Sequence, residues 1–421
     1  MKTTDGTQTC GCRIELQVVA AVMFLSGVWT NTSTHAQQSS AVPSQSVGAS
    51  EVVMIDRLRT VIQYEMTAKE LPALSIAIVN GDRVVWAEGF GYSDEARTKP
   101  ATAESIYRVG SVSKLFTDIA VMQLVEQNQL SLDAPVSVVL PEFAPRSTGA
   151  AANAPISLRM LMSHRSGLVR EPPVGNYFDA TEPTLAATVA SLNGTTLTYP
   201  SETRTKYSNA GIAVVGAVLA QKQNAAFSKC VDDGVLRPLR MTSSSFEFTA
   251  EVESRFCTPW MWTVDGRRFK AANFPLGMAP AGNLYSNVLD LSKFLVCILK
   301  NGRLPDETSL IRPETLAMMT TPQVGTDGKP LQFGIGFSVQ QLDGHKTIGH
   351  DGAGYDEFSP RSFPMYPGGT SRQRWYRSIL RQEMEAADFS VYEFEWWHFD
   401  YRDWRKYRIG NATFEELDVA K

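Results

Sequence analysis

The dipeptide Asn80-Gly81, set between two apolar runs, is the feature that most constrains how this chain can fold. The flanking runs are "ALSIAIV" (73–79) and "RVVWAEGFG" (83–91). Asn-Gly between apolar segments is the strongest short-range signal for a β-hairpin, because both residues tolerate the positive φ angles of a tight turn. We therefore expect an antiparallel sheet to begin near residue 74.

Segments whose apolar residues have helical spacing flank this hairpin in the sequence. On its N-terminal side, residues 54–70 place four apolar side chains on one face: Ile55, Leu58, Ile62 and Met66. On its C-terminal side, Gly110 opens a second amphipathic helix, whose apolar side chains are Leu115, Phe116, Ile119, Met122 and Val125. Residues 115–270 are predicted to be mostly helical, and strand-like runs return at 333–341 and 345–350. The pattern predicts an α/β (α+β) fold in which a helical part interrupts an antiparallel sheet.

The composition limits the class of partner. The chain has 421 residues, 43% of them hydrophobic, so it can bury a large core. Its formal net charge is -4 at pH 7, which gives no uniformly basic surface. Nucleic acid and anionic lipid are therefore not the expected partners, and small neutral or mixed-charge substrates fit better.

The N-terminus resembles an export signal. An apolar run (16–29) precedes a polar stretch with a small-residue cleavage site after Ala36, and the run is too short to span a bilayer comfortably. We expect a signal peptide over 1–36 and a linker over 37–50, hence a secreted or periplasmic protein with no stable membrane span after cleavage. An uncleaved amphipathic anchor is the alternative, because acidic residues offset the basic ones in the first segment.

Ser111 and Lys114 carry the chemistry that the sequence shows most directly. Three residues apart at a helix start, they project from the same face. Burial and the positive end of the helix disfavour an ammonium there, so Lys114 is expected to be neutral enough to take the proton of Ser111. The N–H groups at that terminus can stabilise an oxyanion. The Ser-x-x-Lys pattern is weak alone, so its surroundings decide.

Those surroundings resemble the penicillin-recognising serine hydrolases, which include class C β-lactamases, D-alanyl-D-alanine carboxypeptidases and related esterases. The resemblance covers about residues 50–354 and rests on "SIYRVGSVSKLFTDIAVMQLVEQ", "ISLRMLMSHRSGL", "TKYSNAGIAVVGAVLA", "APAGNLYSNVLDLSKFL" and "HKTIGHDGAG". It implies a serine hydrolase domain over 51–354, with its helical part at about 115–270. By the resemblance, Ser111 is the acylated nucleophile and Lys114 its general base. Tyr207 relays the proton to the leaving group with a phenol acidified by the ammonium, and Asn209 binds the substrate amide.

Two further features of this family are altered or duplicated. Tyr285-Ser286-Asn287 repeats the Tyr207 triplet, but Tyr207 follows Ser111 at the family's separation, so we prefer it. Where lactamases carry Lys-Thr-Gly, this chain has His350-Asp351-Gly352, with His350 and Gly352 expected on the substrate-binding strand edge. The backbone N–H of Ala353 is then the second oxyanion donor. Histidine anchors a substrate carboxylate more weakly than lysine does.

The tail resembles a different family. Residues 355–421 are similar to the C-terminal part of zinc-dependent D-alanyl-D-alanine dipeptidases, through the signature Glu-Trp-Trp-His. The resemblance implies that Glu395 is a general base and His398 a zinc ligand, with a bend between them. The family's other two ligands lie in an upstream segment with no convincing counterpart here, so zinc is expected only if this partial site is completed. A helical segment at 369–389 precedes two strand-like runs at 390–401 and 404–409, whereas the serine family continues with two strands and a closing helix.

The sequence therefore favours a secreted serine hydrolase that acts through an acyl-enzyme on D-Ala peptides, β-lactams or small esters. Its serine site needs no cofactor, and its partner is a small-molecule or peptidoglycan-peptide substrate. Two alternatives stay open: a zinc D-Ala-D-Ala dipeptidase, and a non-catalytic penicillin-binding or chimeric product. The sequence does not determine the oligomeric state.

Overall fold

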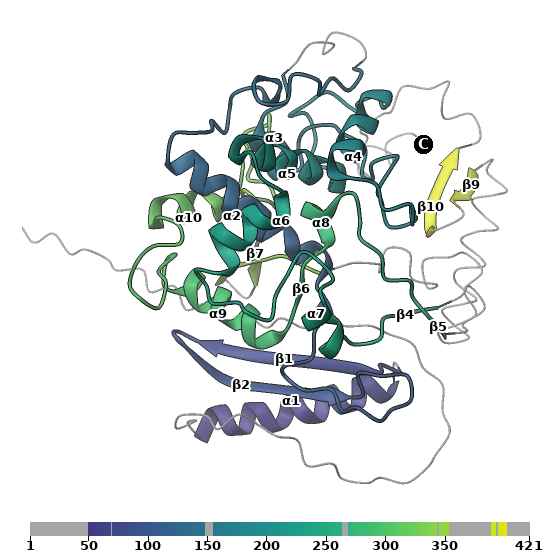
Figure 1. Cartoon of the computed structure of the whole chain (residues 1–421), viewed down its shortest axis with the longest axis vertical. Coiled ribbons are helices and arrows are strands. Elements are labelled where there is room, and N and C mark those ends of the chain that lie inside the picture. The colour runs from purple at the N-terminus through teal and green to yellow at the C-terminus, as the bar shows by residue number, and fades with distance from the viewer. Residues whose placement is uncertain are drawn as a thin grey trace, which may run out of the picture.

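The computed structural model describes residues 49–68, 70–147, 155–262, 268–342, 345–352, 389–392 and 395–401. The hairpin of β1 (Ala73–Asn80) and β2 (Arg83–Gly91) lies at one end of the molecule and is the middle one of three layers. Helix α1 (Ala49–Ala68) runs along one of its faces (Figure 1). The strands pair antiparallel from Ala73↔Gly91 to Asn80↔Arg83, which confirms the predicted hairpin and its start.

The alternation of side chains along the hairpin explains its two partners. Ile76 and Trp86 join Ile55 and Ile62 of α1 in one apolar cluster. On the opposite face, the small side chains Ala77 and Ala87 contact helix α9 (Val288–Leu299). The predicted apolar face of the first helix is thus confirmed, and the hairpin is covered on both sides.

The larger core surrounds helix α2 (Ser113–Glu126), whose side chains Phe116, Ile119 and Met122 have no exposed surface. The remaining helical segments are η2 (Val136–Val138), α3 (Leu158–Met162), α4 (Leu185–Ser191), η4 (Leu192–Gly194), α5 (Asn209–Gln223), α6 (Phe227–Val231), η5 (Asp232–Leu236), α7 (Ala250–Arg255), α8 (Ala279–Gly282) and α10 (Pro313–Met319). Apart from α7, whose Val252 packs in a separate small cluster, their apolar faces merge with α2 into one continuous cluster. A central buried helix fixes the position of any catalytic group at its N-terminus.

The fold class is confirmed as α/β with small antiparallel sheets, but the described strands do not form one continuous sheet. They pair as β1–β2, β3 (Tyr107–Arg108) with β6 (Tyr285–Ser286), β4 (Trp260–Trp262) with β5 (Arg268–Lys270), β7 (Ser338–Leu342) with β8 (His345–Gly349), and β9 (Phe389–Tyr392) with β10 (Glu395–Tyr401).

Two boundaries differ from the sequence prediction. The end of the predicted helical part, 260–270, contains the strands β4 and β5 instead. Strand β7 begins at Ser338 and not at Phe333, because Gly336 has a φ of +78° and interrupts extended backbone.

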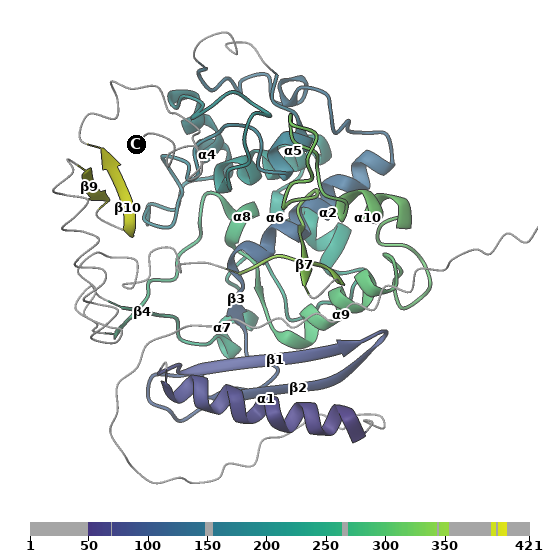
Figure 2. The same ribbon diagram turned by 180° about the vertical axis from the view of Figure 1, so that it is seen from behind.

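The tail strands β9 and β10 confirm that the segment 389–401 is strand-like, and they pair only with each other among the described strands. Figures 1 and 2 place this hairpin apart from β7 and from β1–β2. The predicted helix at 369–389 lies outside the described residues except for Phe389, and the strand-like run at 404–409 lies wholly outside them. None of the helices in the described ranges combines the length and apolar character that a membrane span requires.

Candidate active site

Ser111 lies in a single 3₁₀ turn, η1 (Gly110–Val112), that leads into α2. Gly110 starts this turn with a φ of +52°, a left-handed conformation that glycine adopts without strain. The hydroxyl of Ser113 accepts a hydrogen bond from Leu284 N (3.0 Å) and donates one to Gly110 O. These contacts hold the helix start against β6, so the Ser111 hydroxyl has a fixed position beside the first N–H groups of the helix.

Lys114 is buried directly beneath Ser111. Its Nζ lies 2.9 Å from Ser111 Oγ and 2.8 Å from Ala281 O of α8, and only 1% of the residue is exposed. Burial lowers the pKa of Lys114 to about 7, although the carboxylates of Glu171 and Asp118 act in the opposite direction. This is the direction that the sequence anticipated. Near neutral pH the amine is therefore partly unprotonated and within hydrogen-bond reach of the Ser111 hydroxyl.

Tyr207 lies against Lys114, whose Nζ is 4.8 Å from the centre of the phenol ring. His164 supports the ring from another side: its imidazole is 4.4 Å from the Tyr207 ring, and its Nδ1 accepts a hydrogen bond from Ser208 N (3.3 Å). Ser208 also caps α5, because its hydroxyl accepts from Gly211 N (2.9 Å). The side chains of Ser111 and Lys114 from the start of α2 thus converge with that of Tyr207, which lies just before α5.

The pKa of Tyr207 corrects one sequence expectation. We expected a neighbouring ammonium to lower it, but burial raises it well above the usual range and outweighs the lowering by the Ser111 hydroxyl and Arg170. The Tyr207 hydroxyl lies near Ser111, yet it makes no hydrogen bond to any described residue. A phenol in this environment stays protonated, so it can hand on a proton but does not act as a phenolate base.

Asn209 makes a contact that the sequence did not predict. Its Nδ2 donates to Glu171 Oε1 (2.6 Å), and its Oδ1 is buried with no partner among the described residues. Glu171 also lies 3.5 Å from the Nε of Arg170, and burial raises the pKa of its carboxyl. The guanidinium of Arg170 lies 5.3 Å from the centre of the Tyr207 ring. Asn209 is therefore one member of a polar cluster with Glu171 and Arg170.

The segment His350-Asp351-Gly352 also lies beside Tyr207 and the start of the helix. The ring of His350 lies 6.0 Å from that of Tyr207, and burial lowers the pKa of His350 to about 3, so the imidazole is neutral. Gly352 touches the helix start, since a Cβ there would lie 2.8 Å from Val109 O. Ala353, the predicted second oxyanion donor, lies outside the described residues.

Tyr285, from the repeated triplet, has a different environment. It sits in β6, packs with Ile106 and Val252, and its hydroxyl donates to Asn273 Oδ1 (2.9 Å). The triplet sequence thus occurs once beside Lys114 and once in a structural core.

Sequence reasoning missed four groups around Lys114: Ala281 O, Asp118, Arg170 and Glu171. Asp118 lies one helical turn beyond Lys114, so the spacing of four could have revealed it. Its carboxyl is fully buried without a hydrogen-bond partner among the described residues, and burial raises its pKa well above the usual value. The other three reach the site through loops and α8, for which no local signal exists.

A zinc site gains no support from the described residues, which contain no group of three His, Cys, Asp or Glu side chains arranged to hold a metal. The pairing of β10 with β9 is irregular between Glu395 and Phe399, where the sequence called for a bend. The side chains of Glu395 and His398 lie outside the described part of the structure. Two donors do not meet the three-ligand rule for catalytic zinc, so no step is assigned to a metal.

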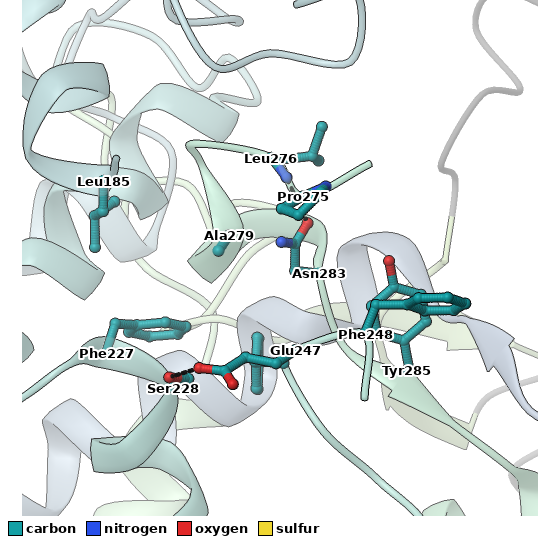
Figure 3. A pocket seen from close by; sticks show the side chains of 11 residues that line it. Leu185, Phe227, Ser228, Glu247, Phe248, Pro275, Leu276, Ala279, Asn283 and Tyr285 are labelled. Atoms are coloured by element: carbon teal, nitrogen blue, oxygen red, sulfur yellow. Dashed lines mark hydrogen bonds between the residues drawn. The ribbon is translucent and has the colours of Figure 1, made fainter. Parts of the chain in front are cut away.

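A cavity of about 250 Å³ adjoins α8, whose Ala279 is part of its lining (Figure 3). Phe227, Phe248 and Tyr285 contribute aromatic walls, and Ser228 donates a hydrogen bond to Glu247 at its rim (2.6 Å). Its lining includes none of the three converging side chains, so the cavity is distinct from the candidate site around Ser111.

Comparisons with known proteins match two family models to this chain. A family model described as Beta-lactamase matches residues 58–358, and one described as D-ala-D-ala dipeptidase matches 305–416, so the two overlap over 305–358. "Beta-lactamase-like protein 2" of Dictyostelium discoideum is 30% identical over 258 residues, which cover 59% of this chain and 46% of that protein. The chain thus spans about half the length of this curated relative.

Solved structures share the fold. The octameric penicillin-binding protein homologue from Pyrococcus abyssi is 28% identical with a TM-score of 0.61, over 70% of this chain and 67% of that chain. EstCE1, a hydrolase with promiscuous acyltransferase activity, is 24% identical with a TM-score of 0.60, over 69% of this chain and 84% of that chain. The second likeness concerns the fold alone.

Proposed function

Since the chain belongs to the β-lactamase family, whose model matches residues 58–358, we propose that it is a serine hydrolase that forms an acyl-enzyme at Ser111. We propose as substrates small D-Ala peptides, β-lactams or esters, and we propose that the protein is exported. One observation carries the proposal: Lys114 Nζ lies 2.9 Å from Ser111 Oγ in a buried site where its pKa is about 7.

In the proposed reaction, Ser111 Oγ bonds to the substrate carbonyl carbon while its proton passes to Lys114 Nζ. The carbonyl oxygen becomes an oxyanion, stabilised by N–H groups that include that of Ser111. The bond to the leaving group then breaks, and the proton from Lys114 reaches the departing atom by way of the Tyr207 hydroxyl. In deacylation, a water oxygen bonds to the acyl carbon and gives a proton to Lys114 Nζ, and the Oγ–acyl bond then breaks as Ser111 Oγ takes that proton back and the acid is released. The neutral, protonated phenol of Tyr207 suits this relay.

The proposal is tested by mass spectrometry of the intact protein after incubation with benzylpenicillin or a p-nitrophenyl ester. We expect a covalent adduct on the peptide that contains Ser111, unaffected by a zinc chelator, and no adduct on Ser111→Ala. An adduct elsewhere would contradict the proposal. Chelator-sensitive cleavage of D-Ala-D-Ala that survives in Ser111→Ala would instead support the zinc dipeptidase alternative, and the absence of any reaction would support a non-catalytic product.

The pKa of Lys114 predicts the pH dependence. The base must be unprotonated, so kcat/KM for an uncharged ester should rise about tenfold per pH unit below pH 7 and level off above it. A stopped assay between pH 5 and pH 9 measures this, with an ester that carries no ionisable group. A midpoint near pH 4, where an ordinary carboxylate titrates, would exclude Lys114 as the base.

A further inference from the structure

The cavity in Figure 3 is lined by a different part of α8 from the part that contacts the catalytic lysine. Ala279, at the start of this turn, and Asn283, directly after it, belong to the lining. Ala281, between them, directs its carbonyl oxygen at Lys114 Nζ, which lies 2.8 Å away. A molecule in the cavity would therefore bind outside the site at Ser111.

The walls of the cavity are mainly aromatic. Phe227 and Phe246 pack edge to face with ring centres 5.1 Å apart, and the ring centres of Phe248 and Tyr285 lie 5.2 Å apart. Phe248 is 37% exposed, so an incoming molecule can reach this wall. The volume of about 250 Å³ exceeds the ~150 Å³ of an engineered apolar cavity that holds benzene in another protein, and it is below the range of drug-sized pockets. The space therefore suits one aromatic ring with short substituents.

A buried amide provides a hydrogen-bond donor to the cavity. Asn283 is 3% exposed, and its Oδ1 accepts hydrogen bonds from Arg108 Nη2 and from Leu276 N (3.3 Å). These two donors fix the orientation of the amide, and the nitrogen points to the Ala279 side of the cavity (Figure 3). This Nδ2 makes no hydrogen bond to a described residue. A ligand with an acceptor would satisfy the donor, which is costly to leave unpaired in a buried place.

The charges around the cavity make its two ends unlike. Glu247 is the one charged residue among the described residues that line it, and its Oε1 accepts a hydrogen bond from Ser228 Oγ (2.6 Å) at the rim. At the amide end, the guanidinium of Arg108 donates to Asn283 and adds a positive charge behind it. A cation is therefore favoured beside Glu247, where the exposed Phe248 ring can also contact it, and an electron-rich acceptor is favoured beside Asn283.

We propose that this cavity is an accessory binding site for a small molecule with one aromatic ring, a cationic amine at one end and a carbonyl acceptor at the other. The ring packs against Phe227 and Phe248, the amine pairs with Glu247, and the carbonyl oxygen accepts from Asn283 Nδ2. Such binding does not depend on acylation of Ser111, because none of the lining residues takes part in the proposed reaction.

The test uses 4-(aminomethyl)benzamide as the probe, beside two molecules that each lack one of its polar groups. Benzylamine has no carbonyl, and 4-methylbenzamide has no amine. NMR titration at pH 7 of protein labelled at its leucine methyl groups should give a Kd on the order of 1 mM or tighter for the probe, as for a ligand of this size. Affinity should fall about tenfold without the carbonyl and about threefold without the amine, whose ion pair lies at the exposed rim.

Two variants match the two polar groups of the probe. Asn283→Asp keeps the oxygen that Arg108 binds and removes the donor, so it should abolish the advantage that the carbonyl gives. Glu247→Gln should abolish the advantage that the amine gives. Glu251→Gln is the matched control, because it removes an exposed carboxylate that pairs with Arg255 and does not line the cavity. It should leave all three affinities unchanged.

Nuclear Overhauser effects locate the probe in the wild-type protein, so the test stands even where a variant fails to fold. The ring protons should lie close to the methyl groups of Leu185 and Leu276, which line the cavity. Contacts to other leucines only, or an unchanged advantage of the carbonyl in folded Asn283→Asp, would overturn the site. The absence of binding up to about 10 mM probe would overturn it as well.

Discussion

Replacing Lys114 with Met should abolish hydrolysis and at the same time raise the free energy of unfolding. The first effect follows from the loss of the proposed general base, because removing one member of a catalytic unit of this kind costs about 10⁴-fold or more in kcat. The second follows from the shift of the Lys114 pKa from 10.5 to about 7 on burial. Between these values the unfolded chain binds the proton and the folded protein does not, so stability rises with pH across this window.

The stability change in Lys114→Met depends on two opposing free energies: the cost of burying the amine and the cost of losing its hydrogen bond to Ala281 O. At pH 7 the cost of burying this lysine is on the order of 4 kcal/mol, from a shift worth about 1.4 kcal/mol per pH unit. Met keeps the length and the apolar stem, but leaves Ala281 O without its donor, which costs roughly 1–3 kcal/mol. The net expectation is a more stable, inactive protein.

Urea unfolding of both proteins at pH 7 and pH 10 measures this change. The advantage of Lys114→Met should shrink at pH 10, where the unfolded lysine is itself losing its proton. Ser111→Ala is the matched control, since it removes activity and leaves the buried amine in place. A Lys114→Met protein that is equally stable at both pH values relative to wild type would show that Lys114 is not held as a destabilised amine.

Substituting the two tyrosines of the repeated triplet should have opposite consequences. Tyr207→Phe removes the proposed proton relay and should slow acylation by about a hundredfold or more for amide substrates. The buried Tyr207 hydroxyl has no hydrogen-bond partner among the described residues, so its removal should not destabilise the fold. Tyr285→Phe loses the hydrogen bond to Asn273 and should cost about 1 kcal/mol of stability, with acylation close to the wild-type rate.

The comparison needs acylation rates and thermal unfolding of both variants, with an amide and with a p-nitrophenyl ester. The ester should respond less to Tyr207→Phe, because its leaving group departs without a proton. Loss of acylation in Tyr285→Phe alone would move the relay to Tyr285 and contradict the geometry at Lys114.

Local patterns predicted much of the fold. The Asn80-Gly81 turn and the spacing of Ile55 and Ile62 predicted the hairpin and its covering helix, because turn chemistry and periodicity are properties of a few adjacent residues. The strands β4 and β5 in the predicted helical part were missed, since short strands depend on their pairing partner.

The sequence by itself determined that Ser111 and Lys114 share one face of a helix start, because residues three apart on a helix are neighbours whatever surrounds them. The resemblance already favoured Tyr207 as the tyrosine beside that pair, but only the tertiary structure decided that burial keeps its phenol protonated and that Arg170 and Glu171 lie nearby. Burial and charge proximity depend on segments far apart in the chain, and no local pattern encodes them. For that reason the proposed nucleophile could be predicted from motifs in the sequence, whereas the charged groups around Lys114 could not.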